Sequence, residues 1–366
     1  MSGTAQHPEA SGAAARLRHW LEERFDLEGL RKFALGKSVP VHKHSIWYFL
    51  GGTSLFLFVV QLVTGVLLMV YYRPSEPHAS VEQIMTQVDF GWLVRSVHAW
   101  TANLLIFFVF IHMFSTMLMR AYRRPRELTW LAGMALLGMM MAFGFSGYLL
   151  PWDEVSFFAT KIGIDIAGKM PVLGSSLAEM LRGGDDVTTN TVQRFYVLHV
   201  WVLPALAAAV LGFHLLLIQV LGISAPPSWE QLPEEKRKTE PFFPNFLTKD
   251  AIVWAGLFAL VVMLSVLWPA RLGREADPIQ PAPIGIKPEW YFLSQYQFLK
   301  LIPPRLLGID GELVGVLLIN LIALFAAALP FIDTGGPGTL RYRAFRVLLP
   351  LGVLGFVAFT VWGKLS

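Results

Sequence analysis

The chain has 366 residues, of which 54% are hydrophobic and 15% charged, and its mean hydropathy is +0.52. A soluble domain of this length needs far less apolar surface, so the composition indicates a membrane protein. The net charge of +4 comes from scattered basic loops, and no basic stripe with interleaved aromatic residues points to nucleic acid. Cysteine is absent, which excludes disulfides, thiolate-bound iron–sulfur clusters and covalent haem attachment through cysteine on this chain.

The first 45 residues are polar and mixed in charge, unlike a secretory signal peptide, so we expect the amino terminus to be retained. Apolar side chains recur among these charges at Trp20, Leu21, Phe25, Leu27, Leu30 and Phe33. Such a pattern is typical of a helix that lies in the membrane interface. Residues 1–45 are therefore predicted to form a cytoplasmic amphipathic tail.

Seven apolar stretches follow, each close to the roughly 20 residues that a helix needs to cross the hydrocarbon core. They run over residues 46–72, 94–119, 128–150, 195–222, 250–270, 312–332 and 345–363. Backbone polar groups in lipid must be satisfied within each segment, which favours helices. The sequence thus predicts an all-α membrane protein with seven transmembrane helices.

The connecting segments divide these helices into two groups. The basic turn at 123–127 is so short that the helices on either side of it must be antiparallel neighbours. The loop at 151–194 contains apolar residues, Pro and Gly, and is expected to form short helices on the outer surface. Residues 223–249 are rich in Pro and charge. We therefore expect a four-helix domain at 46–222, a linker at 223–249 and a three-helix domain at 250–366.

Positive charge predicts the orientation of the chain in the membrane. Lys and Arg are more frequent in the loops on the side of the amino-terminal tail than in the opposite loops. Cytoplasmic loops carry this excess, so the amino terminus is predicted to be cytoplasmic. Seven crossings then place Ser366 outside.

Four of the nine histidines lie within apolar stretches, where an unpartnered polar side chain is costly. His98 and His112 are fourteen residues apart in one stretch, and His199 and His214 are fifteen apart in another. At 100° per residue, the members of each pair share a helix face and are separated by roughly 21 to 22 Å along the axis. If the two helices run parallel, His98 faces His199 near the outer surface and His112 faces His214 nearer the cytoplasm.

Four such imidazoles would hold two haems, each iron lying between two axial His nitrogens. Two other interpretations remain open. The histidines could be buried groups bonded to carbonyls or hydroxyls of neighbouring helices, or they could bind zinc, although helical zinc motifs use spacings of about four residues.

Four glycines repeat the histidine period on two other stretches. Gly51 and Gly65 are fourteen residues apart, as are Gly133 and Gly147. Glycine would let the edge of a macrocycle approach the helix, although small residues also serve ordinary helix packing. Arg95 lies on the face of His98 and could pair with a haem propionate or anchor a lipid headgroup.

Four segments resemble cytochrome b of the bc complexes, and the similarity covers nearly the whole chain. They are GWLVRSVHAW at Gly91–Trp100, GYLLPW at Gly147–Trp152, RFYVLHVWVLP at Arg194–Pro204 and PEWYF at Pro288–Phe292. The fifteen-residue spacing, the YFLGG segment and the PRELTW segment are closer to the b6f-type branch. In that branch the four-helix and three-helix parts are normally separate chains. The cysteine that anchors its extra c-type haem would fall at Phe49, so no covalent haem is expected.

The resemblance implies a Q cycle coupled to proton translocation. Quinol oxidised near the outer face would send one electron to a Rieske iron–sulfur protein and the other across the membrane to quinone. Glu289 would accept a quinol proton, and Tyr291 and Tyr148 would form hydrogen bonds to the quinol ring or line its pocket. Taken by itself, Glu289 could also be a solvated acid of a surface loop. The implied partners are the Rieske protein, a c-type cytochrome, quinone, lipid and a second copy of the chain. The implied location is a bacterial inner membrane.

Two rival classes make different predictions. A di-haem membrane anchor of a dehydrogenase or hydrogenase would have four or five helices and no PEWYF segment. A haem-free transporter would need broken helices and intramembrane charges that face a cavity.

Overall fold

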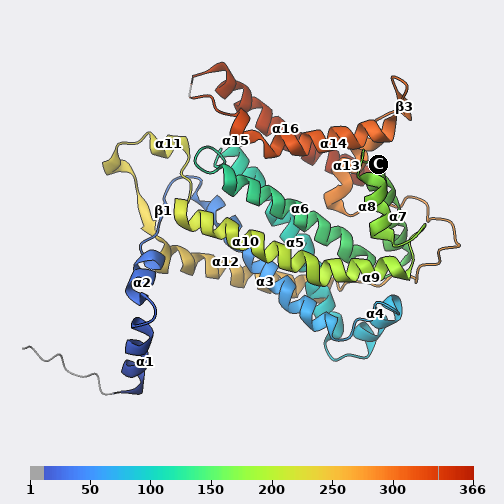
Figure 1. Ribbon diagram of the computed structural model, residues 1–366, viewed down its shortest axis with the longest axis horizontal. Coiled ribbons are helices and arrows are strands. Elements are labelled where there is room, and N and C mark those ends of the chain that lie inside the picture. Colours follow the sequence, from blue (N-terminus) through green and yellow to red (C-terminus); the bar gives the residue numbers. More distant parts are fainter. Residues whose placement is uncertain (1–11, 337) are drawn as a thin grey trace, which may run out of the picture.

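The computed structural model describes residues 12–336 and 338–366. Residues 1–11 of the predicted tail and the side chains of Leu30 and Phe33 lie outside the described part. The rest of the tail forms helices α1 (Ala13–Glu22) and α2 (Leu27–Leu35), and the Asp26 carboxylate caps α2 by accepting a bond from the Gly29 N–H. Both helices lie at one end of the molecule and run across the direction of the long helices (Figure 1).

Within residues 12–336 and 338–366, six helical segments are long and apolar enough to cross a membrane. They are Ser45–Met69 (η1 Ser45–Tyr48 and α3 Phe49–Met69), α5 (Gly91–Leu118), α6 (Glu127–Leu149), Thr189–Leu221 (α9 Thr189–Val197, η2 Leu198–Val202 and α10 Leu203–Leu221), Phe242–Leu267 (η4 Phe242–Phe246 and α12 Leu247–Leu267) and α16 (Leu340–Leu365). The helix predicted to begin at 195 begins at Thr189. The one predicted from 250 begins at Phe242, inside the expected linker.

The stretch predicted as one helix over 312–332 is divided into α14 (Gly311–Ala327) and α15 (Leu329–Ile332). Pro330 has no N–H to donate to the Ala326 carbonyl one turn earlier, and this interrupts the helical bonding. The carbonyl instead accepts a bond of 2.9 Å from Trp130 Nε1 of α6. α14, the apolar helix that remains besides the six long segments, therefore has 17 residues, fewer than any of those six.

The first four long segments form a bundle, in which α3 packs against α5, α5 against α6, and α6 against α10. The last three helices lie around this bundle. In Figure 1, α14 and α16 run along one side of it and α12 along the other. Contacts of α12 with α3 and α5, of α14 with α6, and of α16 with α5 fix these positions. The central apolar cluster includes Leu57, Val97, Leu105, Phe110 and Val261.

Short elements cover the two ends of the bundle. The end opposite the tail carries α4 (Pro77–Thr86), α7 (Glu154–Gly168), α8 (Gly174–Arg182), η5 (Trp290–Phe292), α13 (Leu293–Lys300) and the hairpin of β3 (Arg305–Leu306) with β4 (Ile309–Asp310). The tail end carries α11 (Pro227–Glu230), η3 (Glu234–Lys236) and β1 (Ser38–Pro40) paired with β2 (Thr239–Pro241). The all-α prediction thus needs a small correction. Residues before Pro40 and Pro241 favour extended backbone, and this permits the β1–β2 pair.

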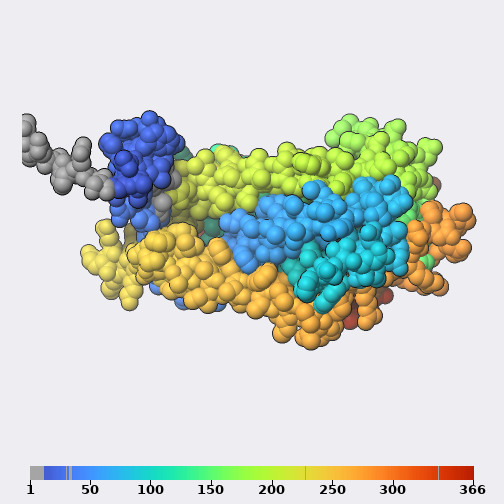
Figure 2. Space-filling model, turned by 90° about the horizontal axis from the view of Figure 1, so that it is seen from below, coloured from blue at the N-terminus to red at the C-terminus, as the bar shows by residue number. Residues whose placement is uncertain are grey.

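Apolar side chains cover much of the outer surface. In the face shown in Figure 2, the α3 segment lies between those of α10 and α12. These three helices expose large apolar residues, including Val63, Val66, Leu216, Val220 and Ile252. A band of this kind favours contact with lipid.

A buried ionic cluster holds the α5–α6 turn to the loop before α16. The Asp333 side chain is fully buried and accepts bonds of 2.6 Å from Tyr122 Oη and 2.8 Å from Arg123 Nη2. Arg120 Nε lies 3.5 Å from the same carboxylate, and Arg120 Nη2 donates to the Tyr342 carbonyl at 2.9 Å. One carboxylate therefore connects two arginines and a tyrosine across the end of the bundle.

Candidate functional site

The two histidines predicted to lie near the outer surface face each other across the bundle. His98 comes from α5 and His199 from η2, and their ring centroids are 6.4 Å apart with the rings tilted by 70°. Two metal–imidazole bonds of about 2 Å each, together with the half-widths of two rings, span about 6 Å. The separation thus fits one metal centre between the rings, as in a haem held by two histidines.

A π-helical turn brings His199 to this position. η2 is wider than an α-helical turn, and it ends two residues before Pro204, which has no N–H to continue regular bonding. The wide turn takes up one residue more than an α-helix would. It therefore absorbs the difference between the fifteen-residue spacing of His199 and His214 and the fourteen-residue spacing on α5.

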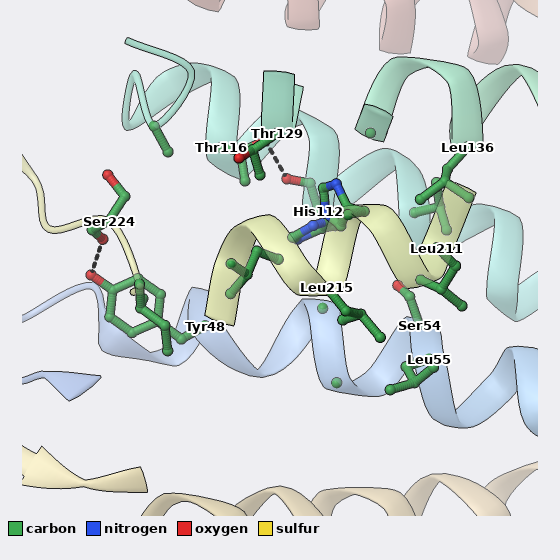
Figure 3. Close-up of a pocket in the computed structure, with 18 of the residues that line it drawn as sticks. Tyr48, Ser54, Leu55, His112, Thr116, Thr129, Leu136, Leu211, Leu215 and Ser224 are labelled. Carbon is green, nitrogen blue, oxygen red and sulfur yellow. Dashed lines mark hydrogen bonds between the residues drawn. The ribbon is translucent and has the colours of Figure 1, made fainter. Parts of the chain in front are cut away.

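The inner histidines lie in a cavity of about 740 Å³ near the tail end of the bundle. His112 of α5 and His214 of α10 both line it, together with Gly51 and Gly133. The other walls are mostly apolar. Figure 3 shows His112 among them, with Tyr48 and Ser224 to one side and Leu136 and Leu211 to the other.

Each predicted glycine lies against one of the four histidine rings. A Cβ placed on Gly51 would lie 3.5 Å from His112 Cε1, and one on Gly65 would lie 3.4 Å from His98 Cε1. The corresponding distances are 3.4 Å from Gly133 to His214 Cε1 and 2.6 Å from Gly147 to His199 Cε1. The glycines of α3 thus make room for the imidazoles of α5, and those of α6 make room for the imidazoles of η2 and α10.

Gly147→Val is expected to displace His199 and so to remove the haem predicted between His98 and His199, while the haem predicted between His112 and His214 is retained. A Cβ at 2.6 Å from Cε1, 3.1 Å from Nδ1 and 3.2 Å from Nε2 forces the ring to move. Haem content of the purified protein, measured by pyridine haemochrome, should fall to one haem per chain. Gly138→Val on the same helix is the matched control, because its Cβ meets nothing within 4 Å. Equal haem loss in both variants would contradict this role for Gly147.

A smaller pocket at the outer end is lined by two of the three predicted quinol-site residues, and the third, Tyr291, is not among its lining residues. Glu289 and Tyr148 line it, together with Lys287 and Lys364. Lys287 Nζ donates to the Lys364 carbonyl at 3.1 Å, which connects the end of α16 to this loop.

The PEWYF segment is anchored on both α5 and α6. Trp290 Nε1 donates to Asn103 Oδ1 of α5 at 2.8 Å. Tyr291 is buried. Its hydroxyl lies 2.7 Å from the position that a Cβ on Gly144 of α6 would occupy. Gly144 is one turn from Gly147, which contacts His199. The Glu289 pocket is therefore adjacent to the outer histidine pair.

Burial raises the pKa of the Glu289 carboxyl above its ordinary value. A hydrogen bond from the Trp290 backbone N–H and the positive charge of Lys364 oppose this shift. The carboxyl is thus poised to exchange a proton nearer to neutral pH than a solvated glutamate. Burial also raises the pKa of Tyr291, which keeps its hydroxyl neutral.

Arg95 binds the backbone that follows α12. Its Nη1 donates to the Ala270 carbonyl at 2.8 Å and its Nη2 to the Arg271 carbonyl at 3.2 Å. These bonds fix the guanidinium at the outer end of α5, one turn before His98. Pairing of Arg95 with a propionate stays a prediction.

Several residues around these sites were not found by sequence reasoning. Thr64 Oγ1 lies 2.9 Å from His98 Nδ1, and Ser146 Oγ lies 3.1 Å from His199 Nδ1. Both hydroxyl residues directly precede a glycine of the fourteen-residue pattern, and this adjacency is the signal that could have identified them. Gln61, which donates to the His98 carbonyl at 3.0 Å, has no comparable signal.

Comparisons with known proteins agree with this geometry. The family model "Cytochrome b/b6/petB" matches residues 36–222, and "Cytochrome b(C-terminal)/b6/petD" matches residues 275–366. The "Cytochrome bc complex cytochrome b subunit" of Chlorobaculum thiosulfatiphilum is 46% identical over 352 residues, covering 95% of this chain and 81% of that protein. Cytochrome b6 of Acaryochloris marina (strain MBIC 11017) is 42% identical over 214 residues, which is 58% of this chain and 99% of that protein.

A solved structure, "Hyperthermophilic respiratory Complex III", superposes with a TM-score of 0.82 and 28% identity, covering 94% of this chain and 91% of the other. The fold and the paired sites thus define a multi-pass membrane cytochrome of electron transport. The chain belongs to the cytochrome b family of bc complexes, with b6-like and petD-like parts in one chain. It is a subunit of an oxidoreductase, and its family implies b-type haem. This family membership sets aside both the dehydrogenase anchor and the transporter.

Proposed function

We propose that this chain oxidises quinol at the Glu289 pocket and transfers electrons through two b-type haems to quinone at the opposite membrane face. The observation that carries the proposal is the outer histidine pair, whose rings lie 6.4 Å apart next to the loop that bears Glu289. A quinol in this pocket would then lie next to a proton acceptor, Glu289, and close to an electron acceptor, the outer haem.

Four histidines would hold the two haems, His98 with His199 at the outer end and His112 with His214 at the inner end. Gly51, Gly65, Gly133 and Gly147 would leave space for their rings. When bound, the haems would supply one-electron transfer between the two ends of the bundle. The chain itself holds the imidazoles in facing pairs and excludes water with its apolar core.

At the outer pocket, quinol oxidation releases two electrons and two protons. The Glu289 carboxylate would accept one of these protons, while Tyr291 and Tyr148 would form hydrogen bonds to the quinol ring or line its pocket. Lys364 lines the same pocket and is exposed, so the acid lies close to solvent, into which the proton would be released. One electron would go to a Rieske iron–sulfur protein and the other towards the inner histidine pair.

At the inner end, quinone would bind beside the haem that His112 and His214 would hold. Asp250 lines the cavity that contains both histidines, and its Oδ1 is buried without a hydrogen-bond partner among the described residues, so it is a candidate for proton supply. No covalent haem is expected here, because Phe49 takes the place of the anchoring cysteine. Its ring stacks on Phe246 with centroids 4.7 Å apart and parallel planes.

The remaining partners and topology belong to the same proposal. The Rieske protein and a c-type cytochrome would accept electrons, and the chain would act as a homodimer in a bacterial inner membrane. With α14 counted, seven crossings would place the tail in the cytoplasm and Ser366 outside. The tail at 1–45, the four-helix domain at 46–222, the linker at 223–249 and the three-helix domain at 250–366 would be the functional units.

Glu289→Gln tests the proposal. Turnover of quinol oxidation by the purified complex is expected to fall about 100-fold, because general-base help to proton transfer is lost. Since the carboxylate exists only above its pKa, wild-type turnover should rise with pH through that pKa, and the variant should lose this rise. Both haem spectra should be unchanged.

Asp277→Asn is the matched control for this variant, because it removes an exposed carboxylate of the same outer loop. Its turnover and pH profile should equal those of the wild type. Unchanged turnover and pH dependence in Glu289→Gln would rule out Glu289 as the proton acceptor.

A further inference from the structure

The hydroxyl groups of Thr64 and Ser146 contact the outer histidines at the Nδ1 atom of each ring. Both residues are buried, with 7% of Thr64 and 0% of Ser146 exposed. Thr64 Oγ1 lies 2.9 Å from Nδ1 of His98, and Ser146 Oγ lies 3.1 Å from Nδ1 of His199. The two contacts come from different helices, α3 and α6, so the outer site has one hydroxyl on each side.

The hydroxyl protons determine the direction of these bonds. Thr64 Oγ1 donates its proton to the Val60 carbonyl at 2.8 Å, and Ser146 Oγ donates to the Phe143 carbonyl at 3.3 Å. Each oxygen is therefore left as an acceptor for the Nδ1–H of its histidine. The neutral imidazole then carries its proton on Nδ1 and keeps a lone pair on Nε2, the atom that would bind a metal.

The inner site is built differently. Leu50 precedes Gly51 and Ala132 precedes Gly133, so apolar residues take the places that correspond to Thr64 and Ser146. The Nδ1 atoms of His112 and His214 bond to no side-chain hydroxyl in the part of the chain that the structure describes. The nearby Thr116 hydroxyl donates to the backbone carbonyl of His112 instead, at 3.0 Å.

We infer that Thr64 and Ser146 are positioning residues that fix the Nδ1–H tautomer of His98 and His199 and lower the reduction potential of the haem at the outer site. The inference rests on the proposed function, in which these two histidines would hold the outer haem. An imidazole that donates Nδ1–H to an acceptor becomes a more basic ligand. A more basic ligand stabilises the oxidised iron, and hydrogen bonding of this kind is one of the ways in which a protein sets a haem potential.

This difference between the sites has a direct consequence for the direction of electron transfer. In the described part of the chain, the outer site receives two hydroxyl contacts and the inner site none, while the His214 ring has a backbone contact with Thr129. This effect would therefore lower the outer potential more than the inner one. The reduction of the inner site from the outer site is thereby favoured, and the electron moves away from the quinol pocket.

Thr64→Val tests the inference, because valine keeps the shape of threonine and removes the hydroxyl. Redox titration of both haems in the purified complex should show the outer midpoint rising by up to about 59 mV, which is a tenfold change for one electron. The inner midpoint should be unchanged. Ser146→Ala should shift the outer midpoint in the same direction. Thr116→Val is the matched control, because its hydroxyl contacts only backbone near His112, and it should shift neither midpoint.

Two outcomes would overturn the inference: an outer midpoint that is unchanged in both hydroxyl variants, or an equal rise at both haems. If Thr64→Val loses the outer haem, the variant Thr64→Ser tests the role of the hydroxyl instead. Serine keeps the hydroxyl, so a retained haem at the wild-type potential supports the inference and a lost haem overturns it. Failure of the proposed ligation is separate, because it would show as two retained haems in His98→Leu.

Discussion

His112→Leu is expected to leave the purified complex with one non-covalent b haem per chain in place of two. Leucine has no nitrogen for iron, and His214 alone would be left facing the apolar wall of the cavity. The outer pair is independent of this change, because His98 and His199 lie at the other end of the same helices and keep their contacts with Thr64 and Ser146. Pyridine haemochrome content and a redox-titrated difference spectrum measure the loss.

His98→Leu is the reciprocal variant and should remove only the outer haem. The two variants should therefore lose different components of the difference spectrum, with each component keeping its own midpoint. Loss of both haems in each variant, from protein that still elutes as the intact complex, would contradict two independent sites. Two haems remaining in His112→Leu would contradict His112 as a ligand.

Asp333→Ala is expected to cause the largest loss of stability among substitutions outside the haem sites. It removes the acceptor shared by Tyr122 Oη and Arg123 Nη2, and among the described residues it leaves Arg120 without an ion-pair partner. Removing one partner of a buried ion pair costs about 3 kcal/mol or more, because the remaining charge stays buried. The thermal midpoint of the complex should fall clearly. Limited proteolysis should cut the loop between α15 and α16 faster.

Asp165→Ala is the matched control, because Asp165 pairs with Arg182 at the surface and its side chain is 55% exposed. An exposed pair contributes about 1 kcal/mol or less, so this variant should unfold close to the wild-type temperature. Equal thermal midpoints for the two variants would show that the Asp333 cluster does not stabilise the fold.

Local features of the sequence were sufficient to predict the helices and most of the residues in the two sites. Apolar length identified each long segment, since a run of roughly 20 residues is needed to cross the bilayer. The division of the stretch at 312–332 was missed because it depends on Pro330 and on the bond from Trp130 to Ala326. That bond joins helices far apart in the sequence, so no local pattern reports it.

The packing of the last three helices could also not be predicted from the sequence. A Pro-rich segment indicated a linker and hence a second group of helices, yet α12, α14 and α16 pack on different sides of the first four. Which faces meet depends on the fit of side chains such as Trp290 against Asn103, which no periodicity contains. The same holds for Glu289, because its pocket exists only where α6, α16 and the loop before η5 come together.

The sequence by itself determined that His98, His112, His199 and His214 lie at two depths on two helices, because helical periodicity and apolar length are local properties. It also placed a glycine at each matching depth on two other helices. Tertiary structure decided which glycine meets which ring, how the π turn of η2 absorbs the extra residue, and which ring nitrogens receive a hydroxyl partner. Those outcomes depend on contacts between α3 and α5 and between α6 and α10, and helix packing alone brings these residues together.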